Sequence, residues 1–246
     1  MARSRIAHAG ARPWIVYRAS RVLKWFLTNE NYRNAMLVRL VQPRNLFQPD
    51  NYTEPDRYPR LFALARRELG NGPEKRILSF GCSTGEEVFS LRRYFADAKI
   101  EGVDINPHNI TVCRRVLASN PDPGLNFAVV SSPTSLGSER YDAIFCMAVF
   151  RHGALGDQVW ERCDKFIRFA AFDATTAQLA RSLKVGGLLF IENSHFRFRD
   201  TGAFVDFEVV GEGVVDESLV REPTYDRDNR LISGETSREV AFRRLR

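Results

Sequence analysis

Residues 77–106 read ILSFGCSTGEEVFSLRRYFADAKIEGVDIN, and this stretch decides the fold. An apolar run, Ile77 to Phe80, stops at a turn of small residues between Gly81 and Gly85, and helical periodicity begins directly after it. A second apolar run, residues 100–103, ends at Asp104. A strand, a turn, a helix and a strand in this order form a βαβ unit. The sequence therefore predicts a doubly wound α/β fold with a mostly parallel sheet.

The glycine turn predicts a binding site for a nucleoside cofactor. Glycines at the carboxyl end of a strand let a ligand press against the backbone, and the helix that follows offers free N–H groups and the positive end of its dipole. Asp104 ends the next strand beside the same crevice. A carboxylate at that place can accept hydrogen bonds from both hydroxyls of a ribose.

The spacing of the turn excludes two common nucleotide-binding motifs. Val88 stands where the dinucleotide fingerprint needs its third glycine, and no Gly-Lys-Ser/Thr follows, as a P-loop would require. Glu86 and Glu87 begin the helix, where they would repel a pyrophosphate but not an ammonium or a sulfonium. S-adenosylmethionine carries both cationic groups. We expect its methionine end over the turn and its ribose at the end of the second strand.

Four stretches resemble a class I S-adenosylmethionine-dependent methyltransferase. They are GCSTGEE at 81–87, the strand that ends at Asp104, YDAIFC at 141–146 and LKVGGLLF at 183–190. Within that superfamily, the Ser-Thr-Gly-Glu-Glu string is similar to that of the chemotaxis receptor-glutamate (CheR-type) methyltransferases. The resemblance covers roughly residues 51–196. It implies a Rossmann-like, seven-stranded sheet with a C-terminal antiparallel hairpin, and S-adenosylmethionine as the cofactor.

The predicted cofactor-binding residues come from four places in this fold. They lie in the glycine turn, at the end of the second strand, after the third strand and at the end of the fourth. Hydroxyls follow the third strand, where superfamily members often carry a carboxylate for the adenine amine. The set is Gly81, Cys82, Ser83, Thr84, Gly85, Glu86, Asp104, Ile105, Asn106, Ser131, Ser132, Cys146 and Met147.

The chemistry is predicted at residues 147–152, because ligands of open α/β sheets bind outside the carboxyl ends of the strands. His152 is the candidate catalytic residue, since an imidazole titrates near neutrality; the alternative is a histidine that caps a turn. His195, after the fifth strand, is a second candidate. The chemotaxis enzymes carry Asn-Val and a tyrosine where this chain has Ala148-Val149 and His152, and Thr53 stands in the place of their arginine.

These departures favour a small-molecule acceptor that is methylated on oxygen or nitrogen by in-line displacement. Two alternatives remain open. One is a protein-glutamate O-methyltransferase, as the resemblance suggests, and the other is a non-catalytic scaffold that binds the cofactor. A nicotinamide-dependent oxidoreductase is disfavoured by the turn and its two glutamates. The Asn/Asp-Pro-Pro-aromatic motif of base-amine methylases is absent at 147–152.

The cysteines and the apolar runs bear on metal content and compartment. Cys82, Cys113, Cys146 and Cys163 stand far apart, with no C-x-x-C pair, which argues against a zinc site and a disulfide framework. We expect no metal and a cytoplasmic protein, since unpaired cysteines suit a reducing compartment. No apolar run approaches the roughly 18 residues that span a bilayer.

Charge divides the chain into two predicted parts. The net charge is +6, but the residues before Pro49 hold nine basic side chains and one acidic one, so that segment carries +8 and the rest about −2. We predict a basic helical arm at 1–50 and a methyltransferase domain at 51–246. Residues 1–45 could pack as amphipathic helices or contact an anionic membrane or nucleic acid. Their Arg-rich, acid-poor composition also resembles an organelle transit peptide.

The remaining elements follow from periodicity and turn residues. Helices are predicted at 58–69 and 107–118, and a longer helical segment, broken near Asp173, at 158–183. Strands are predicted at 125–130, 188–191 and 204–210, with a closing pair at 230–232 and 239–243.

Overall fold

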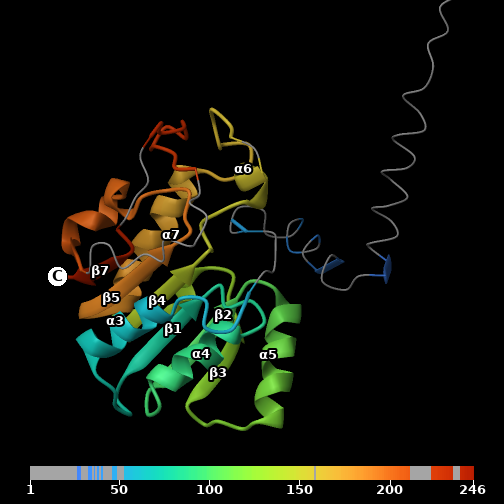
Figure 1. Ribbon diagram of the computed structural model, residues 1–246, viewed down its shortest axis with the longest axis vertical. Coiled ribbons are helices and arrows are strands. Elements are labelled where there is room, and N and C mark those ends of the chain that lie inside the picture. The colour runs from blue at the N-terminus through green and yellow to red at the C-terminus, as the bar shows by residue number, and fades with distance from the viewer. Residues whose placement is uncertain are drawn as a thin grey trace, which may run out of the picture.

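The computed structural model describes residues 27–28, 33–34, 36, 38, 40, 46–48, 53–157, 159–210, 223–234 and 239–246. Figure 1 shows its helices and strands in chain order. They are α3 (Pro59–Leu69), β1 (Arg76–Phe80), α4 (Glu86–Tyr94), β2 (Lys99–Asp104), α5 (Pro107–Ser119), β3 (Leu125–Val129), η1 (Pro133–Leu136), β4 (Tyr141–Met147), α6 (Gly153–Asp157), α7 (Phe169–Ser182), β5 (Leu183–Glu192), η2 (Phe198–Asp200), η3 (Gly202–Asp206), β6 (Phe207–Val209) and β7 (Ala241–Arg244).

One seven-stranded sheet organises these elements, in the order β3-β2-β1-β4-β5-β7-β6. The first five strands pair in parallel, whereas β7 runs antiparallel to both β5 and β6. The order reverses at β1, and β4 lies on its other side. This sheet confirms the predicted Rossmann-like class with a C-terminal antiparallel hairpin.

Helices cover both faces of the sheet because neighbouring residues of a strand point to opposite faces. Helices α3, α4 and α5 pack on one face, and α7 and the short helices η1 and η2 pack on the other (Figure 1). On the first face, the rings of Phe145 and Phe190 stack at 4.5 Å, and Phe62 meets Phe145 edge-on at 5.5 Å. These buried rings fix α3 against the centre of the sheet.

The prediction of a long helix at 158–183 was wrong in its first half. Residues 159–168 form no helix, and α7 starts at Phe169 and runs unbroken through Asp173. Tertiary hydrogen bonds hold the preceding segment: Cys163 N donates to Asn229 O (3.1 Å), and Leu231 N donates to Glu161 O (2.9 Å). Helix α7 then passes directly into β5, which begins five residues earlier than the predicted strand.

The predicted closing pair was also wrong. Leu231 makes an isolated bridge to Tyr225, whereas β7 pairs with β5 and β6. The strand predicted at 204–210 is shorter than expected, because residues 202–206 form η3 and β6 begins at Phe207.

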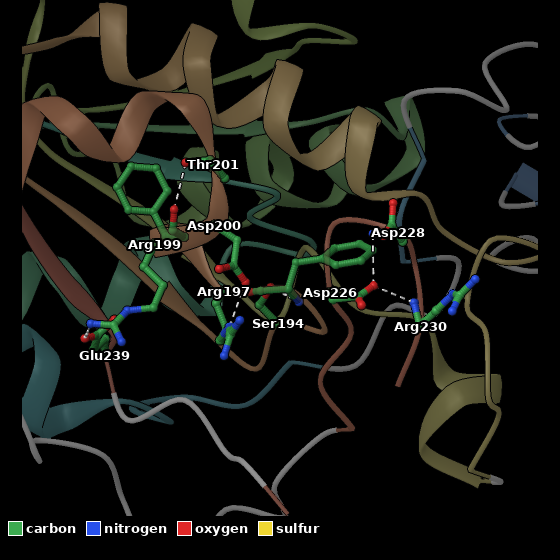
Figure 2. Close-up of polar contacts among 11 residues, drawn as sticks. Ser194, Arg197, Arg199, Asp200, Thr201, Asp226, Asp228, Arg230 and Glu239 are labelled. Carbon is green, nitrogen blue, oxygen red and sulfur yellow. Dashed lines mark hydrogen bonds and ion pairs between the residues drawn. The ribbon is translucent and has the colours of Figure 1, made fainter. Parts of the chain in front are cut away.

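Ion pairs and backbone hydrogen bonds hold the segment that follows β5 (Figure 2). Arg197 Nε lies 2.7 Å from Asp200 Oδ2, and these side chains are only 17% and 16% exposed. Arg199 pairs with Glu239, at the entrance to β7. Asp226 Oδ1 accepts hydrogen bonds from the N–H groups of residues 228 and 230, at 2.9 and 2.8 Å. The carboxyl edge of β5 is therefore tied to the C-terminal part of the chain.

An Arg197→Met substitution is expected to lower the free energy of unfolding by about 1–3 kcal/mol, because it leaves the half-buried Asp200 carboxylate without its guanidinium. Arg162→Met is the matched control, since the Arg162–Asp164 pair is 47% and 39% exposed and should contribute little. Urea unfolding of both variants measures the difference. Equal losses would contradict the role of burial.

Most of the predicted arm at 1–50 lies outside the described residues, so its division from 51–246, its helices and its contacts stay predictions. None of the helices described here is both long enough and apolar enough to cross a membrane.

Candidate functional site

The glycine turn between β1 and α4 is fastened to the end of β2. Gly81 N and Cys82 N both donate to Val103 O, at 2.8 and 3.0 Å. The turn needs left-handed backbone at Gly81 (φ +78°), Ser83 (φ +49°) and Gly85 (φ +100°), which glycine adopts without cost. Gly81 is exposed to solvent. The turn therefore exposes backbone at Gly81, at the carboxyl end of β1, whereas Cys82 and Gly85 are buried.

Asp104 lies directly beneath this turn and braces it. Its Oδ2 accepts from Ser83 N (2.9 Å), and its Oδ1 accepts from Asn106 N (2.8 Å) and Asn109 Nδ2 (3.1 Å). Burial raises the pKa of this carboxyl, and the three hydrogen bonds oppose that shift. A carboxylate accepts about four hydrogen bonds. Asp104 therefore keeps acceptor capacity for a sugar hydroxyl while it holds the turn.

The two glutamates of the turn face different partners. Glu86 accepts a hydrogen bond from Thr84 Oγ1 at 2.7 Å. Glu87, which sequence reasoning left out of the predicted site, instead accepts from Ser79 Oγ on β1, also at 2.7 Å. Burial raises the pKa of Glu87 to about 7. This places a carboxylate that titrates near neutrality under the turn.

The free energy of unfolding is expected to fall as the pH rises from about 4.5 to about 7, because Glu87 has its ordinary pKa of 4.5 when unfolded and a pKa of about 7 when folded. The folded state therefore holds more protons in this window, and stability is lost as they leave. Glu87→Gln should flatten this slope. Ser79→Ala removes a hydrogen bond that lowers the pKa of Glu87, so it should move the fall to higher pH. Urea unfolding across this window measures both, and an unchanged slope in Glu87→Gln would contradict the assignment.

A second set of polar side chains lies together at the carboxyl edge of the sheet, next to the end of β5. Asn193 Nδ2 donates to Tyr58 Oη at 2.9 Å, and the Arg57 guanidinium lies 5.3 Å from the centre of the Tyr58 ring. Burial raises the pKa of Tyr58 to about 12, so the phenol stays protonated. The charge of Arg57 opposes the upward shifts of both Tyr58 and Glu87. Thr53 stands where the chemotaxis enzymes carry an arginine, but Arg57, four residues later, brings a cation to this edge.

Strained backbone marks the same edge. Ala148 follows β4 with φ +58°, and Asn193 follows β5 with φ +51°. The two strand ends are joined by a hydrogen bond from Ala148 N to Glu192 O, at 2.9 Å. Non-glycine residues adopt this region at a cost, and such residues cluster at functional sites. The strain therefore coincides with the edge at which the sequence predicts chemistry.

A cavity of about 640 Å³ opens on the α7 face of the sheet. Phe80, next to the glycine turn, and Ser131 and Ser132, after β3, form part of its wall. Ser132 Oγ donates to Gln178 Oε1 on α7 at 3.2 Å. The lining residues are Leu46, Phe47, Phe80, Ser131, Ser132, Pro133, Asp164, Lys165, Phe166, Ile167, Arg168, Ala170, Ala171, Ala174, Thr175 and Gln178.

His152 adjoins this cavity through Phe166, whose ring centre lies 5.1 Å from the imidazole centre. His152 is buried, and its Nδ1 accepts a hydrogen bond from Ala154 N at 3.3 Å. A nitrogen that accepts carries no proton, so the neutral ring carries its proton on Nε2. In this tautomer His152 is a hydrogen-bond donor, and acting as a base at Nε2 would break the bond to Ala154.

His195, the second candidate for a catalytic residue, lies in the interior, where both ring nitrogens face backbone carbonyls. It is fully buried, with Nδ1 2.8 Å from Pro223 O and Nε2 3.3 Å from His152 O. Burial lowers its pKa, which favours the neutral ring. Both nitrogens face backbone carbonyls, so His195 joins three segments of the chain.

The remaining residues of the predicted set lie in the glycine turn, after β2 and at the end of β4. Asn106 caps α5 by accepting from His108 N at 3.0 Å, and Ile105 lies between it and Asp104. Cys82, Cys146 and Met147 are buried. Burial raises the pKa of both thiols, so they are poor nucleophiles. Across the described ranges, no cluster of three or more histidine, cysteine and acidic side chains could hold a metal ion.

Comparisons with known proteins point to one kind of domain. Residues 77–187 match the family model described as a methyltransferase domain. The ribosomal RNA small subunit methyltransferase C of Shewanella pealeana is 30% identical over 126 residues, which are 51% of this chain and 33% of that protein. The malonyl-[acyl-carrier protein] O-methyltransferase 1 of Ilyobacter polytropus is 30% identical over 82 residues, 33% of this chain and 30% of that protein. The chain spans about a third of the length of these curated relatives.

The chain also has similarity to solved structures. Phosphoethanolamine N-methyltransferase 2 of Haemonchus contortus, in complex with S-adenosyl-L-methionine, is 18% identical with a TM-score of 0.43, over 78% of this chain and 37% of that one. The PH0226 protein of Pyrococcus horikoshii is 18% identical with a TM-score of 0.43, over 62% and 63% of the two chains.

Proposed function

We propose that this chain, whose residues 77–187 match the methyltransferase domain model, is a class I S-adenosylmethionine-dependent methyltransferase that methylates an oxygen or nitrogen of a small molecule. The observation that carries the proposal is the glycine turn. It is exposed at Gly81, braced from below by Asp104 and flanked by the Glu87 carboxylate. This arrangement brings together exposed backbone, a hydrogen-bond acceptor for a ribose hydroxyl and a negative charge. A nucleoside that carries cationic groups requires all three.

The residues present fit this cofactor. Within the part of the chain that the structure describes, Ser83 Oγ in the turn is buried without a hydrogen-bond partner, as expected of a group that a ligand contacts. Glu87 would hold the ammonium of the methionine end, with Glu86 at the rim of the turn. Asp104 would accept a ribose hydroxyl, and Ser131 and Ser132 would lie against the adenine. S-adenosylmethionine supplies an activated methyl group, so the reaction needs no metal.

The remaining work of the protein is to position the acceptor and to exclude water. His152 Nε2–H can donate a hydrogen bond to the acceptor, because the Ala154 N–H fixes the opposite nitrogen. Phe166 lies between this imidazole and the cavity. Phe47, which meets Phe150 edge-on at 5.1 Å, closes another wall. These rings give the acceptor a dry environment beside the turn.

The test is calorimetric titration of S-adenosylhomocysteine. We expect binding to the wild-type protein and at least tenfold weaker binding to Asp104→Ala, which corresponds to about 1.4 kcal/mol. Asp97→Ala is the control, because Asp97 is exposed and lies just before the opposite end of β2, where its carboxylate accepts a hydrogen bond from Asn71 Nδ2 at 2.6 Å. Near-ultraviolet circular dichroism verifies folding. Failure of the folded wild-type protein to bind would refute the proposal.

The resemblance to the chemotaxis enzymes suggests a protein glutamate as the alternative acceptor. The shared string ends in Glu87, and the structure gives that residue a distinct position under the turn. Incubation with labelled S-adenosylmethionine and candidate acceptor proteins separates the alternatives. Base-labile label on protein would support a glutamate ester, and label on a small molecule alone would exclude it.

The basic residues at 1–45 support a further proposed partner, an anionic surface such as a membrane or a nucleic acid. Deletion of 1–45 is expected to abolish binding to anionic vesicles or nucleic acid and to leave S-adenosylhomocysteine affinity unchanged. Loss of cofactor affinity would instead assign these residues to the binding site.

A further inference from the structure

The cavity beside α7 has an aromatic wall that suits a flat apolar molecule. Phe47, Phe80 and Phe166 reach it from three separate segments, together with Ile167. The rings are anchored from behind: Phe47 contacts Phe150, and Phe166 contacts both Trp160 (5.2 Å) and His152 (5.1 Å). Aromatic faces prefer to pack against planar partners. The wall therefore selects for an aromatic or conjugated ring system.

The facing wall, on α7, is made of small residues. Ala170, Ala171 and Ala174 line the cavity, while Thr175 and Gln178 continue the same side toward Ser132. Alanine leaves room that any larger side chain would fill. The volume of about 640 Å³ lies in the usual range for pockets that enclose a small ligand, roughly 300–1,000 Å³.

The cavity's charged residues leave a positive surplus. Lys165 and Arg168 both line it and are exposed. Asp164 also lines it, but its Oδ1 lies 3.3 Å from Arg162 Nε, which offsets its charge. Among the described residues, neither Lys165 nor Arg168 has a carboxylate within ion-pair distance; Arg168 Nε donates to the backbone carbonyl of Asp164 at 3.4 Å. Lys165 Nζ lies 5.9 Å from the centre of the Trp160 ring, and the charge of Arg168 also acts on Asp164. Two cations therefore line the cavity against the single carboxylate of Asp164, which gives it a positive surplus.

We propose that the methyl acceptor is a flat, apolar molecule that carries a carboxylate or similar anion, with its ring system against Phe80 and Phe166 and its anion at Lys165 and Arg168. This inference rests on the proposed function, and it narrows the acceptor to a chemical class. The same placement brings the acceptor's hydroxyl or amine toward the Gly81 turn, since Phe80 adjoins that turn and Phe166 adjoins His152.

The test compares two naphthalene probes that differ by one carboxylate group, 3-hydroxy-2-naphthoate and 2-naphthol. Each is titrated into protein saturated with S-adenosylhomocysteine, and methyl transfer to each is measured with S-adenosylmethionine. We expect the anion to bind at least tenfold more tightly than the neutral probe. The double variant Lys165→Gln/Arg168→Gln should abolish that preference while still binding 2-naphthol. The backbone carbonyl of Arg168 accepts the first hydrogen bonds of α7, from the N–H groups of Ala171 and Phe172, and a change of the Arg168 side chain leaves this carbonyl in place.

Two further variants serve as controls. Arg181→Gln removes an exposed cation from the last turn of the same helix, outside the cavity, and should keep the preference. Ala174→Trp should fill the cavity and abolish binding of both probes; because Ser131 and Ser132 line the same cavity, its S-adenosylhomocysteine affinity is measured alongside.

Each outcome separates the two proposals. Equal affinity for the probes, or a preference that survives in the double variant, would overturn the acceptor class. S-adenosylhomocysteine binding without binding of either probe would also overturn it and leave the methyltransferase proposal intact. Discrimination between the probes in a folded protein that binds no S-adenosylhomocysteine would support the anion site and overturn the methyltransferase proposal instead.

Discussion

Gly81→Ala is expected to weaken S-adenosylhomocysteine binding at least tenfold, the largest effect on affinity that we predict for a one-carbon change. A Cβ at this position would lie 2.6 Å from Val149 Cγ2, so Val149 must move or the turn must open. Gly81 N also donates to Val103 O, which ties any displacement to the end of β2 beside Asp104. The added methyl group therefore disturbs both the backbone surface and its support. Calorimetry measures the change in affinity.

Gly137→Ala supplies the matched control. Gly137 has φ +79°, nearly the same as the +78° of Gly81, but a Cβ there would meet nothing within 4 Å. Both variants pay the cost of left-handed backbone, about 1–2 kcal/mol. Both variants should therefore lose stability, but only Gly81→Ala should also bind S-adenosylhomocysteine more weakly. If both variants bind S-adenosylhomocysteine alike, the contact with Val149 has no part in the site.

Phe172→Ala is expected to lower the free energy of unfolding by about 3–5 kcal/mol. Phe172 is fully buried, and its ring meets those of Phe150 (4.9 Å), Phe196 (5.4 Å) and Phe169 (6.0 Å). These neighbours follow β4, follow β5 and begin α7, so one ring packs the edge of the sheet against the helix. Its removal leaves a cavity that the rigid strand ends cannot close. Urea unfolding gives the magnitude.

Phe166→Ala separates packing from binding. Phe166 is only partly buried and lines the cavity, so its loss should cost less stability than that of Phe172. It should nevertheless weaken binding of 3-hydroxy-2-naphthoate more than Phe172→Ala does at a temperature where both variants are folded. The reverse order would show that the aromatic wall acts through stability alone.

Local signals were enough to predict the centre of the sheet. Short, mostly apolar runs mark β1, β2 and β4 because parallel strands are buried on both faces, and Pro107 with the Asn106 cap marks the start of α5. The segment at 159–168 could not be read in this way. Trp160, Phe166 and Ile167 recur at helical spacing, but the backbone groups of Glu161 and Cys163 in the same segment bond to residues 231 and 229, far along the chain. Long-range pairing overrode local periodicity there.

The cofactor side was easier to predict than the acceptor side. The turn and Asp104 are brought together by one βαβ unit, whose geometry follows from adjacent residues. Glu87 was missed because consecutive helical residues face different directions, and only the structure shows that Ser79 holds it. Arg57, Tyr58 and Asn193 meet across the sheet edge from distant parts of the sequence. The cavity itself is a gap between segments, which no single stretch encodes.

The direct passage of α7 into β5 has a mechanical consequence. Ser182 ends the helix and Leu183 begins the strand, where Leu183 pairs with Tyr141 of β4 before the register shifts toward Leu188. The helix that carries the alanine wall is therefore joined to the sheet directly at its last residue. A ligand that does not match this wall has to be accommodated by side chains on the other sides of the cavity, among them Phe47 and Phe166. We expect selectivity among ring systems to arise from the shape of the α7 wall, while the aromatic side chains on the other sides of the cavity adjust to the ligand.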